Sequence, residues 1–290
     1  MRSLLFVPAD GGAKLDKAMA SGADAVIIDL EDSITPERKG AARAACHDFL
    51  KANADKTDRP RLLVRINGLD TGMTDADLEA IVPGKPDAIV FPKAEGGASA
   101  VHLDAKLTAR EAIAGLTEGS IKVLAQAVES AAGLFLAGTF KDASKRLIGM
   151  TWGPEDISAE LGAEANRDEH GILTEPYRLA RNICLYGAAA ARLPAIETVY
   201  VDFRNSEGLR RDTEAARRDG FTGRLAIHPA QVPIINDVFT PTPEQIEAAK
   251  VVIAAFAANP GAGAVGLNGK MLDRPHLVRA QALLARAGVA

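Results

Sequence analysis

Hydrophobic and polar segments alternate regularly along this chain of 290 residues. Short apolar runs rich in Val, Ile and Leu are separated by longer stretches rich in Ala, Lys, Glu and Arg, a pattern typical of βα units around a parallel sheet. Eight runs predict strands, at Leu4–Val7, Ala25–Leu30, Leu62–Ile66, Ala88–Phe91, Ile121–Ala127, Leu147–Thr151, Thr198–Val201 and Arg224–Ile227. The stretches between them predict helices, among them Ala13–Met19, Pro36–Ala52, Ala98–Ala114, Glu175–Ala191 and Ser206–Asp219.

Eight βα units in a chain of this length favour a closed barrel over an open doubly wound sheet. The turn after the first run, Pro8–Gly12, does not match the Gly-rich phosphate-binding fingerprint that follows the first strand of a doubly wound sheet. We therefore predict a (β/α)8 TIM barrel over residues 1–238.

The remaining segment, residues 239–290, departs from the βα pattern. Pro241 and Pro243 interrupt the alternation, a helix is predicted over Pro243–Ala257, a Gly-rich stretch covers Asn259–Gly269, and a last amphipathic helix is predicted over His276–Ala287. A C-terminal extension of this length beyond a closed barrel predicts a lid or an arm that bridges subunits.

Composition narrows the class of protein. The formal net charge is -4, the sequence pI is about 5.8, and aromatic residues make up 4% of the chain. Since the chain has no basic stripe with interleaved aromatic residues, its composition argues against nucleic-acid binding. No apolar run approaches the roughly 20 residues of a membrane span. The apolar stretch near the amino terminus is too short for a signal-peptide core, which predicts a cytoplasmic protein. Cys46 and Cys184 lack metal-ligand spacing and are expected to be buried thiols.

The residues just after the predicted strands are unusually polar. In a TIM barrel these positions meet at one rim, where catalytic groups lie. They are Asp29, Glu31 and Asp32, then Arg65 and Asn67, Lys93 and Glu95, Glu129, Glu155 and Asp156, and finally His228. Two carboxylates and a guanidinium at one mouth can hold a hard divalent cation and a small carboxylate substrate. Since no pair of histidines has zinc-ligand spacing, Mg²⁺ or Mn²⁺ is the expected ion.

Each of these residues also has a purely structural interpretation. Glu129 can be an acid in the first turn of a helix, and Asp156 can be a helix cap. The acids after the second strand can be helix-start residues, and Arg65 can pair with one of them instead of with a substrate carboxylate. We expect His228 to be a core histidine bonded to the backbone and Lys93 to act electrostatically, because nothing around Lys93 indicates the desolvation of a Schiff-base lysine.

A series of short motifs occurs in a fixed order along the chain. They are Phe6–Asp10 (FVPAD), Asp29–Ser33 (DLEDS), Val64–Asn67 (VRIN), Phe91–Glu95 (FPKAE), Val128–Gly133 (VESAAG), Trp152–Asp156 (WGPED), Ile227–Gln231 (IHPAQ) and Gly269–Pro275 (GKMLDRP). Each motif alone is weak. Together they resemble the citrate lyase β-subunit and malyl-CoA lyase family over nearly the whole chain.

The resemblance implies a TIM barrel with a C-terminal extension, assembled as a homotrimer or homohexamer, that makes or breaks a carbon–carbon bond in a 3-hydroxyacyl thioester. On matching positions, Glu129 and Asp156 hold Mg²⁺, and Arg65 binds the carboxylate of an α-keto acid. Gly153 and Pro154 belong to the same substrate-binding segment as Asp156.

Further roles follow from the same resemblance. Glu31 and Asp32 order waters around the metal, and Asp273, reaching in from a neighbouring subunit, is the general acid/base for the acetyl carbon. Independently of the resemblance, Lys14 or Lys17, near the end of the first strand, is a candidate for contact with CoA phosphates, and a solvated lysine is the preferred interpretation. Asn268 departs from the family pattern, because many relatives have an acidic residue there.

The expected activity is Mg²⁺-dependent cleavage or formation of a 3-hydroxyacyl-CoA such as malyl-CoA or citramalyl-CoA, with acetyl-CoA and an α-keto acid as the other partners. Two alternatives stay open on the same scaffold. One is a malyl-CoA thioesterase, and the other is a citrate lyase β-subunit that acts on an acyl-carrier-protein thioester. The chain does not distinguish glyoxylate from pyruvate, since one methyl group in an apolar pocket changes binding by only ~1–3 kcal/mol.

Overall fold

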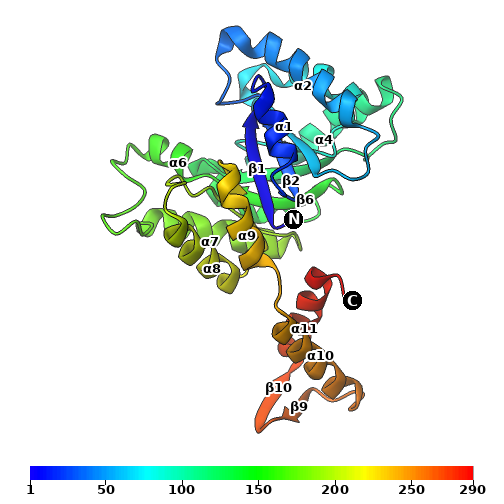
Figure 1. The fold of residues 1–290 in the computed structure, drawn as a ribbon, viewed down its shortest axis with the longest axis vertical. Helices are drawn as coiled ribbons and strands as arrows, with labels where there is room; N and C mark the ends of the chain where they lie inside the picture. The colour runs from blue at the N-terminus through cyan, green and yellow to red at the C-terminus, as the bar shows by residue number, and fades with distance from the viewer. Residues whose placement is uncertain (290) are drawn as a thin grey trace. The chain divides into compact units, whose positions relative to one another are not determined.

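The computed structural model describes residues 1–289 and divides into two compact units, Met1–Asn236 and Asp237–Ala290 (Figure 1). The first unit holds an eight-stranded sheet in which all paired neighbours run parallel, in the order β6-β5-β4-β3-β2-β1-β8-β7. The strands are β1 Ser3–Pro8, β2 Ala25–Asp29, β3 Arg61–Arg65, β4 Ala88–Phe91, β5 Lys122–Val128, β6 Leu147–Trp152, β7 Ile196–Glu197 and β8 Gly223–Ala226.

The two end strands of this sheet, β6 and β7, approach each other. A parallel bridge joins Met150 of β6 to Ala195, and the Met150 backbone N–H donates to the carbonyl of Pro194 at 2.9 Å. The sheet is therefore a nearly closed barrel, which confirms the predicted (β/α)8 class.

Helices alternate with the strands along the chain and lie outside the sheet (Figure 1). They are α1 Ala13–Met19, α2 Lys39–Asn53, α3 Thr74–Ile81, α4 Gly96–Ile113, α5 Ala131–Leu136, α6 Pro154–Leu161, α7 Glu175–Ala190, α8 Ser206–Asp219 and α9 Val232–Phe239. In α7 the buried residues Tyr177, Ala180, Cys184 and Ala188 recur at helical spacing, so one apolar stripe packs inward. The sequence predicted α1 and α8 residue for residue.

The barrel interior explains where the polar residues gather. Ala25 and Ile27 of β2, Leu63 of β3 and Leu124 of β5 belong to one buried apolar cluster. Because side chains alternate between the faces of a strand, the next inward positions are Asp29, Arg65 and Gln126, near the C-terminal strand ends. The apolar core of the barrel thus ends in a polar layer at the rim.

The predicted seventh strand, Thr198–Val201, is wrong, since β7 covers only Ile196–Glu197. The Glu197 carboxylate is buried and accepts hydrogen bonds from Trp152 Nε1 and Arg181 Nε, both at 2.6 Å. Because the charge of Glu197 interrupts the apolar run in the sequence, the pattern predicts a strand that begins one residue later, at Thr198. The residues from Thr198 onward lie in a loop instead.

The second unit contains two helices and a hairpin. They are α10 Pro243–Ala257, the antiparallel strands β9 Ala264–Leu267 and β10 Lys270–Asp273, and α11 Arg274–Ala287. Ala249, Ala280 and Leu284 form its buried core. The hairpin turn is Asn268-Gly269, with φ angles of 50° and 74°, and these residue types are the ones such a turn favours. The predicted helices are confirmed, whereas the hairpin lies where the sequence predicted only a Gly-rich stretch.

Two further expectations concern the thiols and the membrane. Cys46 and Cys184 are buried and unbonded to each other, as predicted, and burial raises the pKa of both thiols. Among residues 1–289, no helix combines the length and the apolarity that crossing a membrane demands.

Candidate active site

Arg65 lies at the centre of a network of charged side chains at the barrel rim. Its Nε and Nη2 atoms each lie 2.7 Å from an oxygen of Asp29, in a bidentate pair, and its Nη1 atom lies 3.0 Å from Glu31 and 3.7 Å from Asp32. The Phe6 ring lies against the guanidinium, with Cζ 4.9 Å from the ring centroid. Acidic partners thus neutralise Arg65, as one of the two sequence interpretations proposed.

This pairing still leaves Arg65 able to bind a ligand. A guanidinium has five N–H donors, and the Asp29 and Glu31 contacts occupy three of them. The Arg65 side chain is 12% exposed. Burial alone would lower the pKa of Arg65, but the hydrogen bonds and charge of Asp29 raise it above its ordinary value, so a fixed positive charge remains at the rim.

The acids after β2 are not helix-start residues. The next helical turn, a 3-10 helix at Pro36–Arg38, is preceded by Thr35, and Asp29 instead accepts from the backbone N–H groups of Glu31 and Ser33. Burial raises the pKa of the Glu31 carboxyl, whereas the Asp32 side chain is largely exposed. This segment therefore presents one buried and one exposed acid beside Arg65.

Lys93 connects the acids of three different strand ends. Its ammonium lies 2.9 Å from Glu31 and 3.3 Å from Asp156, and its backbone N–H donates to Glu129 Oε2 at 2.8 Å. The φ angle of Lys93 is 47°, a left-handed conformation that costs a non-Gly residue about 1 kcal/mol and here directs the amide at Glu129. Burial would lower the pKa of Lys93, but the bond to Glu31 and the neighbouring carboxylates raise it, which supports an electrostatic role.

Glu129 is buried, with 5% of its surface exposed. Gln126 Nε2 donates to its Oε1 atom at 2.6 Å, and the Lys93 amide holds the other oxygen. Burial, reinforced by the nearby charges of Glu31 and Asp156, raises the pKa of Glu129 to about 8. Glu129 precedes Ser130, the N-cap of α5, so its interpretation as an acid of the first helical turn is wrong.

Gly153, Pro154 and Asp156 form the turn from β6 into α6. Gly153 is the N-cap, Pro154 is the first helical residue, and Asp156 lies in the first turn, so Asp156 is not the cap. A Cβ atom at Gly153 would lie 2.7 Å from Glu129 Oε1, which explains why glycine occurs there. The turn therefore brings a partly exposed carboxylate toward Lys93 while leaving room for Glu129.

Glu129 and Asp156 offer oxygen donors that suit a hard divalent cation. Burial and, to a smaller extent, the carboxylates of Glu31 and Asp156 raise the pKa of Glu129, and a bound cation would relieve the repulsion among these acids. Residues 1–289 contain no group of three or more His, Cys, Asp or Glu side chains arranged to hold a metal. The remaining ligands of an ion at this pair would be water or substrate oxygens, as is common for Mg²⁺.

A buried network that the sequence did not predict supports the β2 loop. Lys39 of α2 donates to the carbonyls of Leu30 and Glu31 at 2.7 and 2.8 Å and to Asn67 Oδ1 at 2.8 Å. Asn67 in turn donates to Asp77 Oδ2 at 2.7 Å. These bonds fix the backbone that carries Glu31 and Asp32. An isolated lysine in a helix sequence gives no sign of this role.

Lys14 and Lys17 of α1 line one cavity of about 450 Å³ beside β1. Both lysines are exposed, and His228 lines the same cavity. The prediction of a core histidine is wrong: His228 is exposed and stacks on Phe203 with ring centroids 4.8 Å apart. Its expected backbone bond is present, because the Ala230 N–H donates to His228 Nδ1.

Asp273, in the second unit, is the residue just before α11. Its Oδ1 atom lies 2.5 Å from His276 Nδ1, and this contact lowers the pKa of the carboxyl. Asp273 is therefore an anion with a fixed orientation within its own unit.

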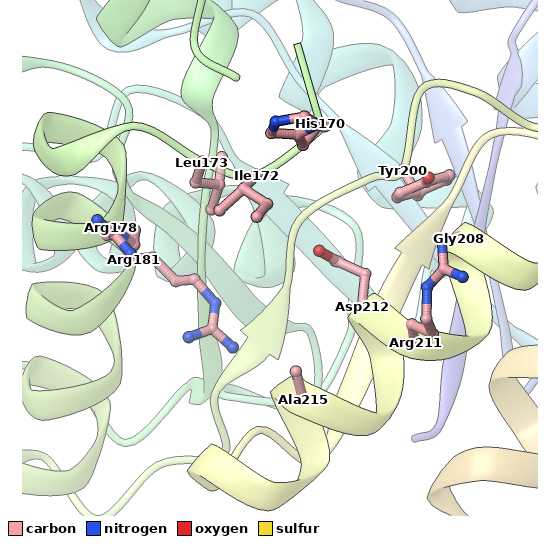
Figure 2. A pocket seen from close by; sticks show the side chains of 11 residues that line it. His170, Ile172, Leu173, Arg178, Arg181, Tyr200, Gly208, Arg211, Asp212 and Ala215 are labelled. Atoms are coloured by element: carbon pink, nitrogen blue, oxygen red, sulfur yellow. The ribbon is translucent and has the colours of Figure 1, made fainter. Parts of the chain in front are cut away.

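A second cavity, of about 310 Å³, lies between α7 and α8 and contains none of the predicted site residues (Figure 2). Three arginines line it, but two of them are paired within the protein: Arg178 with Glu175, and Arg181 with Glu197 and Asp219. We interpret this cluster mainly as an ion-pair network that joins the two helices.

The family model described as HpcH/HpaI aldolase/citrate lyase matches residues 2–229, which is most of the chain. The chain belongs to this family. The family resemblance in the sequence is thereby confirmed, and the protein is a citrate lyase β-like member of a family of enzymes.

Several relatives in the family match nearly the whole chain. The citrate lyase subunit beta of Leuconostoc mesenteroides subsp. cremoris is 34% identical over 99% of this chain and 93% of its own length. A (3S)-malyl-CoA thioesterase of Cereibacter sphaeroides is 38% identical over 99% and 94%. The crystal structure of CitE from Mycobacterium tuberculosis, in complex with magnesium, acetoacetate and coenzyme A, is 32% identical, covers 99% of this chain and 100% of that one, and has a TM-score of 0.77.

Proposed function

We propose that this protein is a Mg²⁺-dependent carbon–carbon lyase that cleaves, or forms, a 3-hydroxyacyl-CoA such as malyl-CoA or citramalyl-CoA. The observation that carries the proposal is the convergence of Arg65, Glu129 and Asp156 on one barrel mouth, linked through Glu31 and Lys93. Full-length similarity to citrate lyase β-subunits and to a CitE structure that holds magnesium, acetoacetate and coenzyme A supports it.

Glu129 and Asp156 would hold the cation. When bound, Mg²⁺ would supply positive charge to the carboxylate and keto oxygens of an α-keto acid. Arg65, with two N–H donors left after pairing with Asp29 and Glu31, would bind the same carboxylate and stabilise negative charge that develops on the reacting oxygen. The buried Glu31 and the exposed Asp32 both lie beside Arg65. Both carboxylates would orient water near the cation.

In the cleavage direction the bond between C2 and C3 of the acyl chain breaks. The hydroxyl proton would pass to water, the hydroxyl oxygen would become the keto oxygen of the released acid, and the bonding electron pair would pass to the acetyl thioester as an enolate. Asp273 would deliver a proton to that carbon, and in the reverse direction it would remove one from the methyl group. The contact with His276 favours the ionised carboxyl, the form that removes a proton in the reverse direction, and in the cleavage direction the carboxyl would first take up a proton from water.

The cavity lined by Lys14 and Lys17 is the proposed site for the phosphates of CoA. Both lysines are on α1, three residues apart, and both line this one cavity of about 450 Å³. We further propose that the protein acts as a homotrimer or homohexamer in which the tail, as lid or arm, brings Asp273 to a neighbouring barrel.

The test is product analysis with purified protein. Malyl-CoA, citramalyl-CoA and methylmalyl-CoA are incubated with Mg²⁺, and both the α-keto acid and free thiol are measured. We expect α-keto acid with the acyl-CoA product, and no turnover in EDTA or in Glu129→Gln. Full activity in EDTA would overturn the proposal.

Two other activities on this scaffold are distinguished by the same assay. A thioesterase, favoured by the 38% identity to a (3S)-malyl-CoA thioesterase, would release free malate and CoA instead. A citrate lyase β-subunit would need an acyl-carrier-protein thioester, and turnover of a CoA thioester by the isolated chain would contradict that alternative.

A further inference from the structure

The strand that leads to Glu129, β5, pairs irregularly with β6 at two points, and the second lies just before Glu129. In the pairing of β5 with β6, Gln126 lies opposite Thr151 and Val128 lies opposite Trp152, so Ala127 is an extra residue on β5. Such a bulge shifts the side chains that follow it from one face of the strand to the other. Because of the bulge, Glu129 faces the barrel interior beside Gln126, although it is three residues away instead of two or four.

Among the described residues, the Gln126 side chain makes one hydrogen bond, and its partner is Glu129. Its Nε2 atom donates at 2.6 Å, while its Oε1 atom is buried and has no hydrogen-bond partner among the described residues. The neighbouring Thr151 Oγ1 atom is likewise buried without a partner. An unpaired buried acceptor destabilises the folded state, so an apolar residue at position 126 would serve the barrel core better than glutamine does.

We infer that Gln126 is a positioning residue that holds Glu129 as a metal ligand. This inference rests on the proposed function. The Gln126 amide donor and the Lys93 backbone N–H each hold one oxygen of the Glu129 carboxylate, and Gly153 packs so closely against it that an added Cβ would lie 2.7 Å from Oε1.

A positioning role and a packing role predict opposite results for Gln126→Met, which keeps the length of the side chain and removes the donor. Positioning predicts that affinity for Mn²⁺, measured by electron paramagnetic resonance of the free ion without any substrate, falls about 10- to 100-fold. Affinity is the deciding measurement, because the substitution removes the unpaired acceptor of Gln126 but also leaves Glu129 Oε1 without its donor, and these two changes act in opposite directions on the melting temperature. Packing predicts a lower melting temperature and unchanged affinity.

Thr151→Val is the matched control. It removes the unpaired hydroxyl opposite Gln126 without touching the donor to Glu129, so its Mn²⁺ affinity should stay within about twofold of the wild-type value. Wild-type affinity in Gln126→Met, or a loss of affinity accompanied by an equal loss in Thr151→Val, would overturn the inference alone. Failure of the wild-type protein to bind Mn²⁺ would overturn the proposed metal site and the inference with it.

Discussion

At the scale of single residues, this protein places several charges out of contact with water and pairs each of them. Glu111 of α4 is one example away from the rim. Both of its oxygens contact the Arg146 guanidinium, at 2.8 and 2.7 Å, and the backbone N–H groups of Gly119 and Ile121 donate to it. Burial would raise the pKa of Glu111, but these donors lower it to about 2.

Glu111→Gln should therefore destabilise the protein in a pH-dependent way. The folded-state pKa lies below the usual 4.5, so the contribution is complete above about pH 4.5 and is lost as the pH falls toward 2. We expect the free energy of unfolding in urea at pH 7 to fall by about 3 kcal/mol, and the difference from wild type to shrink at pH 3. Glu118→Gln, an exposed acid on the following loop, should change neither value. A pH-independent deficit would contradict this account of the pair.

At the scale of elements, the turns from strand to helix control the site. Lys93 adopts a left-handed conformation after β4, and a bulge in β5 directs Glu129 inward. Gly153, directly after β6, lies so close to the Glu129 carboxylate that an added Cβ would be 2.7 Å from Oε1. The ends of the adjacent strands β4, β5 and β6 thus contribute, in turn, a hydrogen-bond donor, the proposed metal ligand Glu129, and a glycine that leaves room for the Glu129 side chain. The backbone conformation of each turn is set by its own residues, but its effect on the site depends on contacts with the neighbouring strand ends.

Gly153→Ala tests this arrangement. The backbone at Gly153, with φ of -135°, accepts alanine without strain, but the new Cβ atom would lie 2.7 Å from Glu129 Oε1 and 3.2 Å from Glu129 Cγ. We expect Glu129 to move and Mg²⁺-dependent turnover to fall about 10- to 100-fold, with unfolding free energy changed by less than about 1 kcal/mol. Gly138→Ala, where no atom lies within 4 Å of the added Cβ, is the control and should keep full activity. Equal activities in the two variants would count against the proposed metal site.

At the scale of the whole molecule, the proposed chemistry is divided between two units. Arg65, Glu129 and Asp156 belong to the first unit, whereas Asp273 belongs to the second. If Asp273 acts on a neighbouring barrel, as we propose, two inactive variants can complement each other, since one copy supplies the barrel and the other supplies the tail.

Co-expressed Glu129→Gln and Asp273→Asn chains should therefore regain activity that neither has alone. With random assembly, about a quarter of the sites combine an intact barrel with an intact tail. The readout is exchange of solvent deuterium into acetyl-CoA in the presence of an α-keto acid. As a control, Glu129→Gln co-expressed with a chain carrying both substitutions should stay inactive. No recovery in the first mixture would show that Asp273 does not act between copies.

The sequence by itself determined the fold class and the order of residues around the rim. Alternating apolar runs fix eight βα units, and parallel strands bring their C-terminal ends together, so Arg65, Glu129 and Asp156 could be placed at one mouth before any coordinates. These features are readable because strand and helix periodicity depend on neighbours in the chain.

Only the tertiary structure decided which charges touch. The pairing of Arg65 with Asp29, the reach of Lys93 to Glu31 and Asp156, the Gln126 donor to Glu129 and the exposure of His228 all depend on strand register and side-chain packing between segments far apart in sequence. The short β7 was missed for the same reason, because Glu197 is buried by partners that its local sequence does not reveal. Hydrogen bonds between distant segments leave no periodic trace along one chain, so their donors and acceptors are known only once the barrel has brought them together.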